Sequence, residues 1–325
     1  MLTSMTRPLV LVTGGAGFLG AQLCRFLLAQ GFAVRSLDSA PGRSVEPAAV
    51  EFIRGDIRDA AVVAEAMRGV GYVVHAASAA ATQPDDVIYS TGVMGTWNVL
   101  QMAARNRAAR VVFLSSSAVY GTHEHHLMHE ADVLNGCGSY AESKIEAEYL
   151  CQGARLGGVC VSILRCADIV GPGCGGIFAE LFDRAARGGH FPLRGAGRQT
   201  CQVLDVEDVC DAIYRCLVMR AGLVNDTFNL GSRDFATLRD CLQGVLDRAG
   251  HGKRVVGWRP WGRVSVGADN SLSVRHIESK LDFRPRHAAR AALVRQYTGY
   301  LRLHRPVGQS SPAVPHSAQY EGVSL

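Results

Sequence analysis

Val10-Leu11-Val12-Thr13-Gly14-Gly15-Ala16-Gly17-Phe18-Leu19-Gly20 is the stretch that decides the fold. It joins an apolar strand to a helix with an apolar face through a glycine-rich loop. Such a loop lets the backbone approach a pyrophosphate and directs a helix N-terminus toward its charge. A glycine triplet also occurs in tight turns for purely steric reasons, but its position between strand and helix, at the start of the chain, favours a dinucleotide. The predicted cofactor residues here are Gly14, Gly17, Phe18, Leu19 and Gly20.

A carboxylate, Asp38, ends the next predicted strand. At that place a carboxylate accepts hydrogen bonds from both ribose hydroxyls and repels a 2′-phosphate, which favours NAD over NADP. Arg35 and Arg43 flank it and are the alternative determinants of the ribose end. A helix-cap or turn role is the alternative interpretation of Asp38 itself.

Short β-branched runs alternate with helical patterns through the first half of the chain. The strand candidates are residues 9–13, 33–37, 51–54, 72–75, 111–115 and 159–164. Because these runs are almost continuously apolar, they predict a parallel sheet covered on both faces, and thus an α/β, doubly wound fold.

The pattern changes after Gly171-Pro172-Gly173, where helical segments at 177–187, 206–219 and 238–249 alternate with irregular ones. We expect an NAD-binding domain over residues 1–172, to which residues 205–235 return. We expect a smaller, mixed substrate-binding cap over 173–204 and 236–305, and a flexible tail over 306–325, which has little apolar content.

The composition excludes several classes of protein. The 325 residues are 48% apolar and carry 34 basic and 29 acidic side chains without a block of like charge, so a nucleic-acid or membrane-surface footprint has no support. No stretch is long and apolar enough for a signal peptide or a membrane span, and we expect a cytoplasmic protein. None of the ten cysteines forms a Cys-x-x-Cys pair, so we expect buried thiols and no metal site. The run from His123 to His129 is expected to be a solvated loop, with an imidazole site as the alternative.

Tyr140 and Lys144 lie one helical turn apart and share a helix face. A free tyrosine titrates near pH 10, roughly three units above neutrality, and a nearby ammonium would favour its phenolate. A strand that ends in Ser115-Ser116-Ser117 precedes them and places hydroxyls at the carboxyl edge of the sheet, where open α/β folds bind ligands. These residues predict a proton-transfer site.

Taken together, these motifs resemble those of the NAD-dependent epimerase/dehydratase family of extended short-chain dehydrogenases/reductases, which have a Rossmann fold. The pattern is nearest to UDP-glucose 4-epimerases. The resemblance spans roughly residues 8–300, and rests on residues 13–20, Asp56, His75-Ala76-Ala77, residues 115–121, Tyr140-x-x-x-Lys144 and Arg165 followed by Gly171-Pro172.

The resemblance implies a role for each matching residue. Tyr140 would be the general base and acid, Lys144 would bind the nicotinamide ribose, and Ser116 would align the substrate hydroxyl. The segment after Gly171-Pro172 would help to close the substrate site. The resemblance further implies that Asp56 and Ile57 contact adenine, that Ala76 and Ala77 line the cofactor, and that Ser117 lies near the substrate.

The sequence departs from the family pattern at three positions. Gly92 replaces an asparagine that supports the active-site lysine, and Cys201 replaces an arginine that clamps a diphosphate. Arg198, Arg263 or Arg194 would then have to bind the phosphates. Asp168 replaces a substrate-contacting asparagine and adds an acceptor-only group near the pocket.

Three functions are compatible with these features. The first is an NAD-dependent nucleotide-sugar epimerase that works through a keto intermediate. The alternative, favoured by Cys201, is a reductase or dehydrogenase of a ketone or alcohol without a nucleotide. A non-catalytic NAD-binding regulator is disfavoured because Ser116, Tyr140 and Lys144 are all present.

We also expect a homodimer. The predicted helices at 95–106 and 140–156 carry more apolar side chains than are needed to pack one face of each helix against the sheet. The resemblance implies that this pair of helices forms a four-helix bundle between two subunits. These side chains are Trp97, Leu100, Met102, Ile145, Tyr149 and Leu150. The alternative is that the sheet and cap bury them within one subunit.

Overall fold

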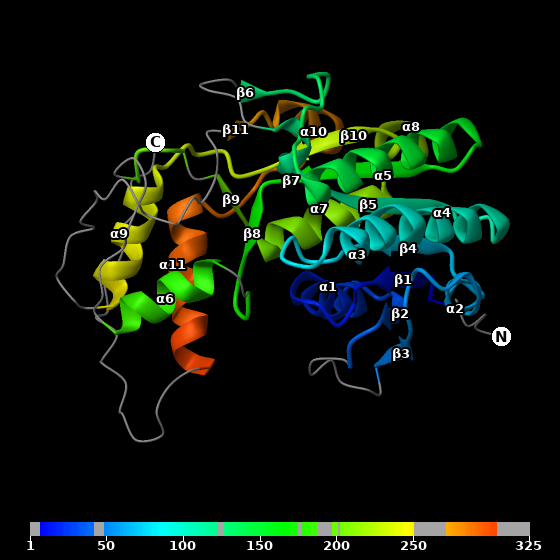
Figure 1. Ribbon diagram of the computed structural model, residues 1–325, viewed down its shortest axis with the longest axis horizontal. Coiled ribbons are helices and arrows are strands. Elements are labelled where there is room, and N and C mark those ends of the chain that lie inside the picture. Colours follow the sequence, from blue (N-terminus) through cyan, green and yellow to red (C-terminus); the bar gives the residue numbers. More distant parts are fainter. Residues whose placement is uncertain are drawn as a thin grey trace, which may run out of the picture.

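The computed structural model describes residues 7–41, 49–121, 127–174, 177–187, 197–200, 202–249 and 271–303. Its centre is a seven-stranded parallel sheet in the order β10-β7-β5-β4-β1-β2-β3 (Figure 1). The chain order reverses beside β1, and this is the place where doubly wound sheets bind ligands. The predicted α/β, doubly wound fold is confirmed.

The strands of this sheet are short and mostly buried, as their apolar sequences predict. They are β1 (Leu9–Thr13), β2 (Ala33–Asp38), β3 (Val50–Arg54), β4 (Tyr72–His75), β5 (Arg110–Ser116), β7 (Val161–Cys166) and β10 (Thr227–Leu230). Two small parallel pairs lie outside it: β6 (Leu127–Met128) with β11 (Ser271–Leu272), and β8 (Asp168–Val170) with β9 (Val203–Asp205).

Helices cover both faces of the sheet. On one face α1 (Phe18–Ala29), α7 (Val206–Val218), α8 (Ala221–Val224) and α10 (Arg275–Leu281) contribute to one apolar core. On the other, α2 (Ala60–Ala66), α4 (Thr96–Arg105) and α5 (Ser139–Leu156) contribute to a second. Beside α5 lie α3 (Asp85–Tyr89) and the π-helical turn η1 (Ser90–Gly95), and the 3₁₀ turn η2 (Ser117–Tyr120) follows β5. No helix in these described ranges is long and apolar enough to cross a membrane.

A separate apolar core lies beyond the carboxyl edge of the sheet. Three helices, α6 (Ile177–Ala186), α9 (Leu238–Ala249) and α11 (Ala289–Leu303), pack together there (Figure 1). Phe182 and Tyr297 are fully buried between them, with ring centroids 5.5 Å apart. This group of helices is called the cap below.

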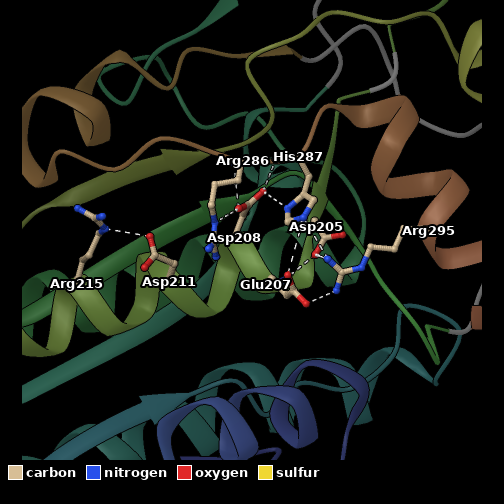
Figure 2. Close-up of polar contacts among 8 residues, drawn as sticks. All are labelled: Asp205, Glu207, Asp208, Asp211, Arg215, Arg286, His287 and Arg295. Atoms are coloured by element: carbon tan, nitrogen blue, oxygen red, sulfur yellow. Dashed lines mark hydrogen bonds and ion pairs between the residues drawn. The ribbon is translucent and has the colours of Figure 1, made fainter. Parts of the chain in front are cut away.

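A cluster of ionic and hydrogen-bonded side chains connects the cap to α7, on the sheet (Figure 2). Asp208, on α7, accepts hydrogen bonds of 3.1 Å from the backbone N–H groups of Arg286 and His287, just before α11. The His287 ring donates from Nδ1 to Asp208 and accepts at Nε2 from Arg295 of α11, both at 3.1 Å. Arg295 also pairs with Glu207 and lies 3.6 Å from Asp205. Asp205, Glu207 and His287 are close enough to one another to hold a metal ion, but a guanidinium already supplies the positive charge here.

The element boundaries differ from prediction in two informative places. The strand expected at 159–164 is β7, Val161–Cys166, because the Val159 N–H bonds back to Ala154 O and completes the end of α5. The helix expected at 95–106 is α4, Thr96–Arg105, and it is continuous with η1. The tail at 306–325 lies outside the described residues.

Candidate active site

A cavity of about 560 Å³ opens above the carboxyl ends of β1, β2 and β4, on the glycine loop. A Cβ at Gly20 would lie 2.1 Å from Gly14 O, so only glycine allows α1 to start this close to the loop. Of the predicted cofactor residues, the cavity is lined by Gly14, Gly17, Phe18, Asp38, Asp56, Ile57, Ala76 and Ala77. Leu19 instead packs against the apolar core, and Gly20 is buried beneath the loop.

Asp38, at the end of β2, lines this cavity. Its Oδ2 accepts a 2.9 Å hydrogen bond from Ala16 N–H, and its Oδ1 accepts one of 2.9 Å from Ala40 N–H. Arg35 is held elsewhere, by Glu51 at 2.9 Å and by Ala66 O at 2.8 Å. Arg35 is therefore not available to a 2′-phosphate at Asp38, while Arg43 lies outside the described residues.

Asp56 and Ile57 form the far wall. The Arg58 guanidinium forms a salt bridge of 2.7 Å with Asp56 and lowers the pKa of that carboxyl. Sequence analysis missed Arg58, as it missed the further lining residues Ser78, Gln83 and Thr91. The sequence gives little indication of these residues, because each is a single polar residue in a loop or short helix. The fold alone brings them to the cavity.

A buried hydrogen-bond chain supports the floor of the cavity. Thr96 Oγ1 donates to Gly92 O at 2.5 Å and so must accept from His75 Nε2 at 2.9 Å. The free Nδ1 of His75 then accepts from Thr13 Oγ1 at 2.7 Å, and Thr13 in turn accepts from the Ala77 N–H. Burial lowers the pKa of His75 to about 3, which keeps the ring neutral in this tautomer.

Ser116, Tyr140 and Lys144 come together at the carboxyl end of β5. Burial raises the pKa of Tyr140, and this is the largest effect on the phenol. A side-chain hydrogen bond between Ser116 and Tyr140 acts in the opposite direction and lowers the pKa by less. Lys144 is buried, donates to Leu114 O at 2.8 Å and lies 6.0 Å from the centroid of the Tyr140 ring. Burial lowers the pKa of Lys144 to about 8.

Packing against α5 explains why position 92 is a glycine. A Cβ at Gly92 would lie 2.9 Å from Ser143 Cβ and Oγ, so η1 packs directly against the helix of Tyr140. Ser143 Oγ donates to Tyr140 O at 2.8 Å and occupies the room that an asparagine side chain would need. This close packing excludes a larger side chain at position 92.

A buried ion pair lies behind Lys144 and was also missed. Glu148, one turn further along α5, accepts from Arg165 Nη2 at 2.7 Å and from Ser115 Oγ at 2.5 Å. Neither charged side chain of the pair is more than 4% exposed. The signal was in the sequence, because Tyr140, Lys144 and Glu148 recur at four-residue spacing on one helix face.

The predicted substrate residues lie in different environments. Ser117 begins η2 next to Ser116 and is half-buried. Asp168, at the start of β8, is exposed, interacts with Tyr140 and raises the pKa of the phenol. Arg198 is exposed. The described residues do not include Arg194, Cys201, Arg263 or the histidines at 123, 125 and 126.

The fold, the glycine loop and the cavity at the sheet's reversal point define a dinucleotide-binding α/β protein. The family model for the NAD dependent epimerase/dehydratase family matches residues 10–231. The chain belongs to this family, and its cofactor is NAD.

Relatives in the family carry out different reactions. The chain is 30% identical to a dTDP-glucose 4,6-dehydratase of Streptomyces niveus, over 90% of this chain and 92% of the relative. It is 32% identical to a 3 beta-hydroxysteroid dehydrogenase/Delta 5-->4-isomerase of Mycobacterium tuberculosis, over 67% of this chain and 61% of the relative. The crystal structure of Thermus thermophilus UDP-glucose 4-epimerase in complex with NAD has a TM-score of 0.77 and 26% identity, and the match covers 90% of this chain and 98% of that one. The family is therefore established, and the reaction has to be argued from the site.

Proposed function

We propose that the protein is an NAD-dependent nucleotide-sugar 4-epimerase. The observation that carries this proposal is the hydrogen-bonded pair of Ser116 and Tyr140, with Lys144 one turn away, beside the cofactor cavity. Bound NAD would supply a reversible hydride acceptor for the sugar carbon.

In this proposal the glycine loop, Asp38 and Lys144 hold the cofactor. The N-terminus of α1 would hold the pyrophosphate, and Asp38 would accept hydrogen bonds from the ribose hydroxyls. Lys144 donates one proton to Leu114 O, which leaves two N–H groups for the nicotinamide ribose.

Tyr140 moves the proton. Its phenolate oxygen takes the proton from the sugar 4-hydroxyl and gives it back after the keto group has turned over. Ser116 already hydrogen-bonds with this phenol and can align the same hydroxyl. Because burial raises the pKa of Tyr140, the positive charges of Lys144 and of the bound cofactor are needed to favour the phenolate.

The proton-transfer groups favour epimerisation over dehydration. Eliminating water from a hexose needs a base for the C5 proton and an acid for the leaving hydroxyl, in addition to Tyr140. The residues that follow Ser116 are Ser117 and Ala118, neither of which is a carboxylic acid. Among the described residues, Asp168 is the one carboxyl that interacts with Tyr140. Epimerisation needs a single acid–base group, which Tyr140 supplies.

Product analysis tests this function. NAD-loaded protein is incubated with UDP-glucose or dTDP-glucose, and the sugar is followed by proton NMR, with Tyr140→Phe as the matched control. We expect the 4-epimer without net NADH. A 4-keto-6-deoxy sugar would make the protein a dehydratase, and stoichiometric NADH would support the dehydrogenase alternative.

We also propose that the protein is a homodimer that packs through α4 and α5, which lie side by side. Trp97 and Tyr149 are 51% and 53% exposed, and Tyr89 on α3 and Met94 on η1 are also exposed. Leu100 and Met102 are buried within the subunit, and Ile145 and Leu150 pack against its cores.

Light scattering at micromolar concentration tests the dimer. Trp97→Glu should give a monomer, whereas the control Phe52→Glu, on edge strand β3, should leave the mass unchanged. A wild-type monomer with full activity would contradict the proposal.

A further inference from the structure

Asp56 lies on the wall of the cofactor cavity, in the loop between β3 and α2. The loop is a tight turn, in which the Asp59 N–H donates to Asp56 O at 3.0 Å. Position 55 has no room for a side chain, since a Cβ at Gly55 would lie 2.3 Å from Val62 Cγ1. The backbone that carries Asp56 is therefore held by close contacts.

Arg58, two residues further on, holds the Asp56 carboxylate itself. Its Nε lies 3.1 Å from Oδ1 and 3.0 Å from Oδ2, and its Nη2 lies 2.7 Å from Oδ2. The backbone N–H of Arg58 also donates to Oδ1, at 2.8 Å. Such a fork fixes the plane of a carboxylate as well as its charge. A carboxylate has about four acceptor sites, so Asp56 can still accept a hydrogen bond from a ligand in the cavity.

Asn98, on α4, supports the same turn. Its Nδ2 donates to Ile57 O and to Arg58 O, both at 3.0 Å. These two hydrogen bonds use both hydrogens of one amide group, and they fix the turn relative to α4. Ile57 is buried, while the side chains of Asp56 and Arg58 are 36% and 42% exposed at the cavity wall.

We propose that Arg58 and Asn98 are positioning residues for the cofactor: they hold the Asp56 carboxylate in place so that the site selects a base with an amino group. The resemblance of the sequence implies that Asp56 contacts adenine. The adenine amino group can donate to an acceptor-only carboxylate, whereas an oxo group at the same position would face its negative charge. This selection goes beyond the proposed function and is independent of the reaction that Tyr140 performs.

NAD and nicotinamide hypoxanthine dinucleotide are a matched pair of probes, since they differ at C6 of the purine, where an oxo group replaces the amino group. The full chain is equilibrated with an equal excess of both and separated from unbound ligand by rapid gel filtration. The bound dinucleotides are then quantified by mass spectrometry. We expect wild type to bind NAD with at least about tenfold preference. Asp56→Asn, whose amide can donate as well as accept, should reduce the preference to about threefold or less.

The positioning role predicts the same loss in variants that keep Asp56. Arg58→Gln and Asn98→Ala should each reduce the preference to about threefold or less, because the carboxylate is then free to turn away from the base. Arg58→Lys keeps the positive charge without the fork and should give an intermediate preference. The control Arg184→Gln breaks a similarly exposed ion pair, which Arg184 forms with Glu180 at 2.9 Å on α6, and should leave the preference unchanged. A general loss of stability would weaken the binding of both dinucleotides together, so the ratio reports the position of the carboxylate.

Two results would overturn this assignment. One is a wild-type preference below about threefold, and the other is a wild-type preference that survives in both Arg58→Gln and Asn98→Ala. The proposed function is tested separately by product analysis. A protein that shows the cofactor preference, with its loss in both variants, but forms no epimer would reject the epimerase and leave the roles of Arg58 and Asn98 standing.

Discussion

Glu148→Gln removes the charge from the buried ion pair behind the active site and keeps the shape of the side chain. The pair is almost fully buried, so water cannot replace the lost partner of Arg165. Breaking one side of a buried pair costs about 3–5 kcal/mol. Arg165 keeps hydrogen bonds to Tyr120 Oη and Glu130 O, so we expect the lower end, about 3 kcal/mol. At roughly 2 °C per kcal/mol for a chain of this size, Tm should fall by about 6 °C.

Thermal unfolding followed by circular dichroism, at saturating NAD, measures this loss. Glu146→Gln changes an exposed carboxylate two residues earlier and should leave Tm within a degree or so of wild type. Glu148 also raises the pKa of Lys144, so the variant should lose activity at lower pH on the alkaline side. A Glu148→Gln Tm indistinguishable from wild type would refute the structural role of the pair.

Four further predictions follow from the site. Tyr140→Phe should abolish turnover and leave NAD affinity within a few-fold, whereas Lys144→Ala should weaken both; stopped-flow rates and NAD titrations distinguish the two. Wild type should bind NAD more tightly than NADP, and Asp38→Ala should narrow the gap in paired titrations; tighter NADP binding would show that Asp38 does not govern the ribose end. His75 should contribute a loss of about 1.4 kcal/mol of unfolding free energy per pH unit as the pH falls from about 6.5 toward its folded pKa of about 3, because the ring binds a proton in the unfolded chain but not in the fold; a His75→Gln variant with the same slope as wild type would contradict this. Arg198→Ala should raise the Kd for a nucleotide diphosphate about tenfold, roughly 1.4 kcal/mol, and unchanged binding would place the phosphate clamp elsewhere.

The fold was predictable because its signals are local. The apolar runs predicted six strands of the large sheet, β1 to β5 and β7, and the glycine loop indicated where the dinucleotide binds. The two-residue strand β6 (Leu127–Met128) was not predicted: it lies in the run from His123 to His129 that was expected to be a solvated loop, and Met128 is buried. Likewise, η1 was not predicted, since Gly92 and Gly95 look like helix breakers in the sequence. Tertiary packing explains both glycines. Gly92 leaves room for Ser143, and a Cβ at Gly95 would lie 2.4 Å from Ile57 Cδ1.

Two parts of the candidate site were predictable, namely most of the lining of the cofactor cavity and the group of Ser116, Tyr140 and Lys144. Ser116, Tyr140 and Lys144 sit on one strand end and one helix face, so their proximity follows from the order of the elements. The partners of His75 and Arg165 come from segments far apart in the chain, and no local pattern connects them. The cap was hardest, because its helices α6, α9 and α11 meet only through long-range packing.

The ionic cluster illustrates the same limit. Asp205, Glu207 and Asp208 lie close together in the sequence, but their partners His287 and Arg295 lie about a quarter of the chain away. Sequence composition cannot distinguish such an ionic cluster from a metal site. The structure does so, because the Arg295 guanidinium lies among the carboxylates.

The fate of the hydrogen on C4 of the sugar distinguishes epimerisation from dehydration and from net oxidation. UDP-glucose deuterated at C4 is converted by the NAD-loaded protein, and the position of deuterium in the product is determined by NMR and mass spectrometry. Our account predicts that deuterium stays on C4 of the epimerised sugar and that no NADH accumulates. Deuterium on C6 of a dehydrated sugar, or its loss from the sugar together with accumulating NADH, would contradict the account.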